Sequence, residues 1–286
     1  MNRGPVIFIS AFLAFAVSFG AFVLAPQIQI GRQALTVSVA SGDVYPNARA
    51  GQAAQGAQVY RAQGCVACHS QSVRQDGANF DVILTDGGTN HAATLSVLEK
   101  LTSKASCEIV PVTALAGLTD KNHAVAAVKA LTEVGAKASI AVRPFGADIA
   151  RGWGARRTVA ADYLFDSPVQ IGSSRLGPDL ANVGARLPDA SWQLIHLFNP
   201  RAVVTGSVMP PSRFLFNVQK IKNNSPSPAA LVLPAGAGVK DGYEVIPTDD
   251  ARALVAYLQS LRVETPLYEA PLTPSAAPAA TTAIAK

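Results

Sequence analysis

The chain has 286 residues, enough for two modest domains or for one domain with a large insertion. Its formal net charge is +5 with 15% charged residues, and no long run of lysine or arginine is present, so a solvated surface explains the basicity better than nucleic-acid binding does. Two of the three cysteines fall in one five-residue motif, which excludes a disulfide scaffold.

An uncharged apolar stretch of 21 residues, from Pro5 to Ala25, begins the chain between Arg3 and Arg32. About 20 apolar residues span a bilayer, whereas the apolar part of a cleaved signal peptide runs for about 7–15 residues. A proline also follows where cleavage would fall. We therefore predict a retained transmembrane anchor at residues 1–26. Because Arg3 lies on a very short tail that would stay in the cytoplasm, we expect the rest of the chain on the outer side of the membrane.

A polar linker is predicted after the anchor, at residues 27–50. Beyond it, the spacing of apolar residues predicts helices at 53–61, 190–198 and 249–262. Residues 217–247 are rich in Pro, Gly and Asn and predict a loop, and the Pro/Ala/Thr-rich residues 266–286 predict a disordered tail.

A change of composition at residue 79 predicts a separate α/β unit that extends to residue 143. Three leucines between residues 95 and 101 have helical spacing, and a second helix is predicted at 120–134 with Thr119 as its cap. Strands are predicted at 80–85 and 138–142. The unit interrupts a chain that is otherwise predicted to be mainly α.

A Cys-x-x-Cys-His motif, formed by Cys65, Cys68 and His69, is the attachment signature of haem c. Each thiol adds to one vinyl group of the porphyrin, and the histidine is then placed under the iron. A redox cysteine pair and half of a zinc site are the alternatives, but a zinc site needs two more ligands, and the chain has no second cysteine pair. We predict one covalent haem c with His69 as the proximal ligand.

The second axial ligand is predicted to be Met209, which precedes Pro210 and is the only methionine besides Met1. Methionine opposite histidine raises the reduction potential of an electron-carrying haem. A lone methionine is usually core filling, but this one lies in a proline-rich loop. His196, on the predicted helix before this loop, is the alternative ligand.

A Gly-Pro pair, Gly177-Pro178, lies between Arg175 and Leu180. This segment resembles the loop of class I cytochromes c in which the Gly-Pro carbonyl accepts the N–H of the proximal histidine. Such a hydrogen bond fixes the tautomer of the ring and tunes the iron.

The spacing of the two predicted iron ligands gives an independent argument for an inserted unit. His69 and Met209 are 140 positions apart, and removing the 65-residue α/β unit leaves 75, which suits a compact cytochrome c core. We therefore predict a single transmembrane helix and a class I cytochrome c domain split into residues 51–78 and 144–265, with the α/β insertion domain at 79–143. Insertions on loops cost little stability.

The motif and its continuation through Arg74 resemble the monohaem subunit of cbb3-type cytochrome c oxidases. The similarity resumes after the insertion at these positions: Tyr163, Asp166, Pro168, Gln170, Gly172, Ser173, Arg175, Gly177 to Leu180, Val183-Gly184, His196-Leu197, Asn199 to Arg201, Val203-Val204, Ser207 and Met209-Pro210. The chain departs from that family at Ser167, Ile171 and Ser174, where His, Trp and Lys are usual.

The resemblance implies a membrane-bound subunit of a bacterial inner membrane whose haem domain lies on the periplasmic face. It implies that the subunit passes electrons from an outer-face cytochrome c to a haem–copper catalytic subunit, beside other cytochrome c subunits, and does not itself reduce oxygen. The haem surroundings would be formed by these residues: Cys65, Cys68, His69, Arg175, Gly177, Pro178, Leu180, Met209 and Pro210. The cytochrome c subunit of a nitric oxide reductase, and an assembly or interaction protein with a structural haem, are the alternatives.

The inserted unit resembles the C-terminal domain of the bacterial ribosomal stalk protein at 80–85, 118–121, 129–131 and 135–142. That domain binds translation factors through a lysine-rich helix pair with a Gly-x-Gly turn. The equivalent stretch here, 102–111, lacks the turn and keeps only Lys104. We therefore expect a spacer or a subunit contact rather than a translation-factor site. Cys107, His91 and His123 lie in the unit and are expected to be packed or surface residues.

Overall fold

A computed structural model of the chain describes residues 3–30, 36–37, 44–46, 48–101, 112–222, 225–267 and 270. Most of the predicted tail (266–286), much of the predicted linker (27–50), the stretch 102–111 and Cys107 lie outside the described residues. The described part combines helices with three small sheets.

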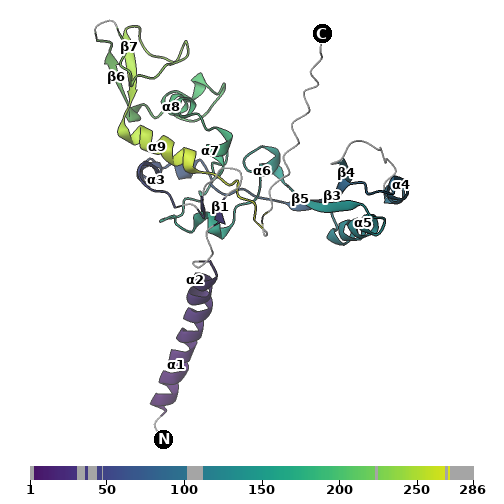
Figure 1. The fold of residues 1–286 in the computed structure, drawn as a ribbon. Coiled ribbons are helices and arrows are strands. Elements are labelled where there is room, and N and C mark those ends of the chain that lie inside the picture. Colours follow the sequence, from purple (N-terminus) through teal and green to yellow (C-terminus); the bar gives the residue numbers. More distant parts are fainter. Residues whose placement is uncertain are drawn as a thin grey trace, which may run out of the picture.

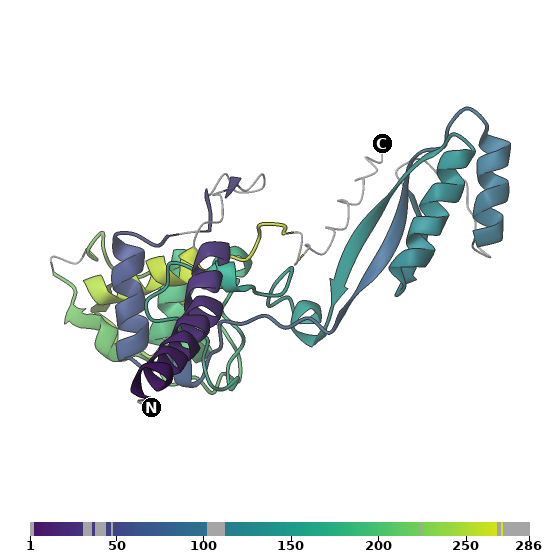
Figure 2. The ribbon, with the colours of Figure 1, turned by 90° about the horizontal axis from the view of Figure 1, so that it is seen from below.

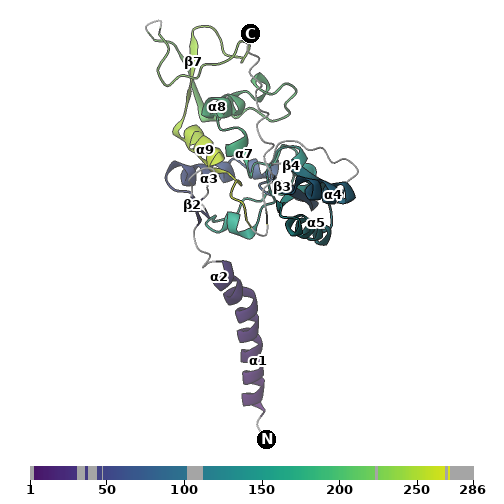
Figure 3. The same cartoon turned by 45° about the vertical axis from the view of Figure 1, so that its right-hand side comes forward.

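A long exposed helix begins the chain, as α1 (Gly4–Phe19), a π-helical turn η1 (Gly20–Leu24) and α2 (Ala25–Ile30). The turn ends two residues before Pro26, which has no N–H to donate to the carbonyl four residues earlier. The helix extends away from the rest of the chain (Figures 1 and 3). In the described part it is the one helix long and apolar enough, over Gly4–Gln29, to cross a membrane. The direction of crossing stays a prediction.

Two crossing helices hold the main core, α3 (Gln52–Ala62) and α9 (Asp249–Ser260). They meet at Gly56, where a Cβ atom would lie only 1.8 Å from the carbonyl oxygen of Ala253. Only glycine allows this approach. The rings of Tyr60 and Tyr257 pack nearby with centroids 5.4 Å apart.

The core around this crossing is completed by α7 (Val183–Arg186) and α8 (Ala190–Phe198). Buried apolar residues outside α3 and α9 contribute to it, among them Leu180, Leu197, Phe198, Leu215, Phe216 and Val245. The structure therefore confirms the helices predicted at 53–61, 190–198 and 249–262.

A separate α/β unit contains the antiparallel sheet β4–β3–β5, with β3 (Gly77–Asp86) at its centre between β4 (Val112–Leu118) and β5 (Lys137–Phe145). Helix α5 (Lys121–Glu133) packs on the sheet, and α4 (His91–Leu101) packs against α5. Its own core contains Val82, Leu84, Leu98, Ala124, Ala127 and Leu131. Figures 1 and 2 show this unit standing apart from α3, α8 and α9.

Two local expectations were wrong, the cap of α5 and the loop at 217–247, and one strand was missed. The cap of α5 is Asp120, whose carboxylate accepts a hydrogen bond from the Asn122 amide, and not Thr119. Strand β4 was not predicted, because Gly117 and several alanines weaken its strand pattern. The predicted loop at 217–247 contains β6 (Phe216–Lys220) and β7 (Tyr243–Pro247), which pair with each other; the turn residues between them mask the short strands at its ends.

The remaining elements are short. The strands β1 (Thr36–Val37) and β2 (Val44–Tyr45) pair with each other. The short helices are η2 (Cys65–Ala67), α6 (Ala147–Ala150), η3 (Ala160–Tyr163), η4 (Pro200–Ala202) and η5 (Arg213–Leu215). The predicted domain boundaries and the class I cytochrome c fold stay predictions.

Candidate functional site

The Cys-x-x-Cys-His motif forms a tight helical turn directly after α3. Gly64 adopts a left-handed conformation (φ 67°) that ends α3 and starts η2. The amides of Cys68 and His69 both donate to the Cys65 carbonyl, at 3.2 and 3.0 Å. Both cysteines are free thiols and are partly buried. Cys65 packs against the main core, and burial raises the pKa of its thiol.

His69 is held by the loop that contains Gly177 and Pro178. The Nδ1 atom of His69 lies 2.8 Å from the Pro178 carbonyl oxygen, which can only accept, so Nδ1 carries the proton. This leaves Nε2 as the ring nitrogen with a lone pair for a metal. The Gly177 amide donates to the Cys68 carbonyl at 2.9 Å. A Cβ atom on Gly177 would lie 2.3 Å from His69 Cε1, so glycine is required beside the ring.

We predict that Gly177→Ala displaces the imidazole ring, because no Cβ atom fits 2.3 Å from it. The hydrogen bond to Pro178 would weaken, and overpacking of this kind costs about 1–3 kcal/mol. Thermal unfolding of the full chain in detergent measures the loss. Leu176→Ala, at a neighbouring side chain that is 75% exposed, is the control and should change the free energy of unfolding by no more than about 0.5 kcal/mol. Equal stability of the two variants would refute the contact.

A buried carboxylate, Asp179, fixes the segment that follows His69. Its Oδ2 accepts from the Ser70 hydroxyl at 2.5 Å and from the Ser72 amide at 2.8 Å, and its Oδ1 accepts from the Ala181 amide at 2.8 Å. The side chain of Asp179 is fully buried. It therefore joins residues 70–72 to the loop that carries Pro178.

Arg175 extends this network to a second buried carboxylate, Asp148. The guanidinium donates to Asp148 Oδ1 at 2.8 Å, to Ser70 Oγ at 2.9 Å and to the Ser72 carbonyl, and it lies 3.5 Å from Asp179 Oδ2. These contacts orient the backbone after His69. A direct contact between Arg175 and a cofactor stays a prediction.

Two backbone hydrogen bonds also join the segment after His69 to residues near the Gly-Pro loop. The Leu180 amide donates to the Ser70 carbonyl and the Gln71 amide donates to the Ile171 carbonyl, both at 2.8 Å. Leu180 is buried in the main core. The sequence motif and the Gly-Pro loop, more than 100 positions apart in the chain, therefore form one unit of structure.

Met209 lies in the loop after α8, partly buried against the main core. Its amide donates to Ser207 Oγ at 3.3 Å. The loop is fixed to the helix where the Ser212 amide donates to the Leu197 carbonyl at 2.8 Å. Pro210 is exposed beside Met209.

His196 lies on the last turn of α8, stacked on Trp192 with ring centroids 4.9 Å apart and planes at 8°. Burial lowers the pKa of His196, because a buried imidazole loses the solvation that favours its charged form. Its Nδ1 is buried without a hydrogen-bond partner among the described residues.

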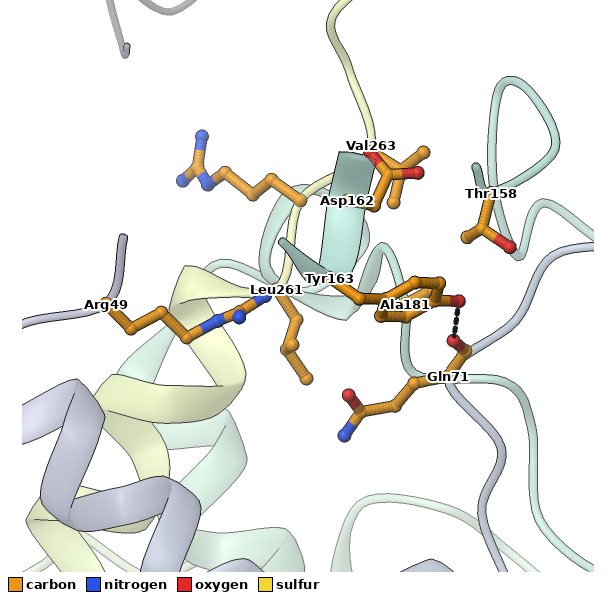
Figure 4. A pocket seen from close by; sticks show the side chains of 9 residues that line it. Arg49, Gln71, Thr158, Asp162, Tyr163, Ala181, Leu261 and Val263 are labelled. Carbon is orange, nitrogen blue, oxygen red and sulfur yellow. Dashed lines mark hydrogen bonds between the residues drawn. The ribbon is translucent and has the colours of Figure 1, made fainter. Parts of the chain in front are cut away.

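A small cavity is lined in part by Gln71, Thr158 and Tyr163 (Figure 4). Its volume is about 20 Å³, which suits one water molecule. The Tyr163 hydroxyl donates to the Gln71 carbonyl at 2.5 Å, and the Tyr257 hydroxyl donates to Gln71 Oε1 at 3.0 Å. This cavity is too small for a porphyrin.

The residues present fit a flat, apolar, covalently attached group. Two free thiols lie on one helical turn, and a histidine with a fixed tautomer follows them. Leu176 and Val208, which neighbour the Gly-Pro pair and Met209 in sequence, are 75% and 83% exposed, although both are apolar. Within the described ranges, no group of three or more His, Cys, Asp and Glu side chains could hold a metal ion.

Asp148 and Asp179 are structural residues of this site that the sequence did not single out. Asp179 follows the Gly-Pro pair directly, so its position was a usable signal. Asp148 gives no such signal, because it lies 27 positions before Arg175 and in no motif.

The chain is similar to a known protein family over part of its length. The model described as cytochrome C oxidase, mono-heme subunit (FixO) matches residues 108–232. The matched stretch includes the Gly-Pro loop, His196 and Met209. It does not include the Cys-x-x-Cys-His motif, which lies before it in the sequence. It also covers part of the α/β unit. No curated protein matches the chain. The match supports similarity to the mono-heme subunit of cytochrome c oxidases, which is a membrane-associated family.

Proposed function

We propose that this chain is a membrane-anchored, monohaem c-type cytochrome that passes electrons to the haem–copper catalytic subunit of a cbb3-type terminal oxidase. Its donor would be a cytochrome c on the periplasmic face of a bacterial inner membrane. The observation that carries the proposal is the hydrogen bond from His69 Nδ1 to the Pro178 carbonyl, which joins the Cys-x-x-Cys-His motif to the family-matched part of the chain.

In this proposal, Cys65 and Cys68 would attach the haem covalently, and His69 and Met209 would hold its iron. The haem iron supplies a reversible one-electron change when the group is bound. The carbonyl of Pro178 holds the proton on Nδ1 of His69 and so directs Nε2 at the metal. Because Met209 packs against the main core, its loop would hold the thioether in place as the second ligand of the iron.

The other predicted site residues support the ligands. Gly177 leaves room for the imidazole, and Leu180 anchors the loop in the core. Arg175 is a positioning residue that acts through Ser70, Ser72 and Asp148. Pro210 limits the conformations of the loop beside Met209.

Purification of the chain from its native membranes tests the oxidase assignment. We expect a catalytic subunit that contains both haem and copper to copurify, with further cytochrome c subunits. A copurifying catalytic subunit without copper would contradict the oxidase assignment and favour the nitric oxide reductase alternative.

The α/β unit is proposed to be a spacer or subunit contact rather than part of the electron path. Its first and last strands pair at Gly77 with Phe145 and at Ala78 with Pro144, so the two ends of the unit are adjacent. We predict that joining Ala78 to Pro144 through a two-residue Asn-Gly turn leaves covalent haem and its spectrum unchanged. Haem staining and a reduced-minus-oxidised spectrum measure this. If the shortened chain folds by circular dichroism but oxidase assembly and turnover are lost, the unit is a required interaction module.

A further inference from the structure

The chain between the apolar helix and α3 is docked on the main core by Arg49. The guanidinium donates to the carboxylate of Asp166 and, at 3.2 Å, to Ser260 Oγ, and it lies 5.7 Å from the centre of the Tyr257 ring. The side chains of Arg49 and Asp166 are each only 12% exposed. Pro46, three positions earlier, is buried. This part of the predicted polar linker is therefore bound to the end of α9.

Tyr45 makes a second contact, with a buried ion pair. Its hydroxyl donates to Asp162 Oδ1 at 2.9 Å, and its ring centre lies 5.8 Å from the guanidinium of Arg156. Arg156 is fully buried and donates to both carboxylate oxygens of Asp162, at 2.9 and 3.0 Å, and to the Thr265 carbonyl at 2.6 Å. A buried charge of this kind depends on its partner, so the surface that receives Tyr45 is well fixed. Both Arg49 and Asp162 also line the small cavity of Figure 4.

These contacts shorten the tether between the apolar helix and the main core. Thr36 of β1 pairs with Tyr45 of β2, so the chain is fixed from Thr36 onward, six positions after the end of α2 at Ile30. Six residues span at most about 21 Å. Without the contacts, the first fixed element would be α3, which begins at Gln52, 22 positions after Ile30, and the tether could span about 75 Å. A two-stranded ribbon is marginal alone, so β1 and β2 depend on these contacts.

We propose that Tyr45, Pro46 and Arg49 form a clasp that holds the domain with the Cys-x-x-Cys-His motif close to the membrane surface. This inference rests on the proposed function, in which the apolar helix is the anchor and the electron acceptor lies in the same membrane. The effective concentration of a tethered group falls roughly as the −3/2 power of the tether length. Tyr45 and Arg49 are thus positioning residues, which act through the length of the tether and not on the haem.

Three altered forms of the full chain test the proposal. Tyr45→Phe/Arg49→Gln removes the clasping hydroxyl and guanidinium. Insertion of a flexible Gly/Ser segment of about 16 residues after Ile30 gives the tether its unclasped length and leaves the clasp intact. The matched control is Tyr243→Phe/Arg61→Gln, at a tyrosine that is 39% exposed and an exposed arginine.

Neutron reflectometry of each form in a supported lipid bilayer measures the depth of the protein layer outside the membrane. We expect a thin layer for the wild type and the control, and a deeper, more diffuse layer for the double variant and the insertion. In the purified oxidase complex, these two forms should reoxidise the haem about sevenfold more slowly, because the tether has 22 residues in place of six. The haem spectrum should be the same in all forms.

The outcomes separate the clasp from the proposed function. A layer of unchanged depth in Tyr45→Phe/Arg49→Gln would overturn the clasp. Equal reoxidation rates in all forms, or slow reoxidation in the double variant but not in the insertion, would overturn the positioning role. Absence of covalent haem in the wild-type chain would defeat the proposed function itself. The depth of the protein layer does not depend on haem and would still test the clasp.

Discussion

Replacement of both Cys65 and Cys68 by alanine is expected to leave the chain without any covalently attached haem. The two thiols are the only free cysteines among the described residues, and they lie at the two ends of one tight turn. Thioether bonds to the porphyrin survive denaturation, whereas a haem held only by axial ligands is released. Haem staining of the denatured polypeptide after electrophoresis measures the loss, which should be complete.

The third cysteine of the chain provides the control for this experiment. Cys107→Ala leaves the attachment motif intact and should give the full haem signal. Each single variant, Cys65→Ala or Cys68→Ala, should retain at most one thioether bond. A full signal on the double cysteine variant would contradict the attachment site, and loss of the signal on Cys107→Ala would contradict the exclusive role of the motif.

A second large effect is expected at Asp179. Asp179→Ala should lower the free energy of unfolding by about 3–5 kcal/mol, because it removes one partner of a buried, charge-assisted network. The Ser70 hydroxyl and the Ser72 and Ala181 amides would lose their acceptor. Because Ser70 follows His69 directly, the proximal ligand should also become less well fixed. Chemical denaturation of the full chain measures the stability.

The matched control is Asp189→Ala. Asp189 also accepts a backbone hydrogen bond, at 2.9 Å from the Ser191 amide, but it is exposed at the start of α8. Loss of such a cap costs about 0.5–2 kcal/mol. A decrease for Asp179→Ala no larger than for Asp189→Ala would show that the buried network does not hold the site together.

Local sequence patterns predicted the elements that local forces determine. The helices α3, α8 and α9 follow from the spacing of apolar residues, and the contact of His69 with Pro178 follows from a short motif and its resemblance to class I cytochromes c. The length of one apolar stretch predicts the anchor. In the structure this stretch forms a helix that is long and apolar enough to cross a membrane.

Features that depend on distant partners could not be predicted. Strand β4 forms because β3 supplies its hydrogen bonds, not because its own residues favour a strand. Asp148 becomes part of the site only when the chain brings Arg175 to it. The burial of His196 Nδ1 likewise depends on the packing of α8 and gives no signal in the sequence.

The role of electron relay is tested most directly by the reoxidation of the covalent haem in the purified oxidase complex. The complex is reduced without oxygen, oxygen is admitted, and the absorbance of the haem on this chain is followed with and without cyanide, which blocks the haem–copper site. The account predicts rapid reoxidation without cyanide and a haem that stays reduced with it. Reoxidation at the same rate in both samples would contradict it, because the electrons would then leave this haem without passing through the catalytic subunit.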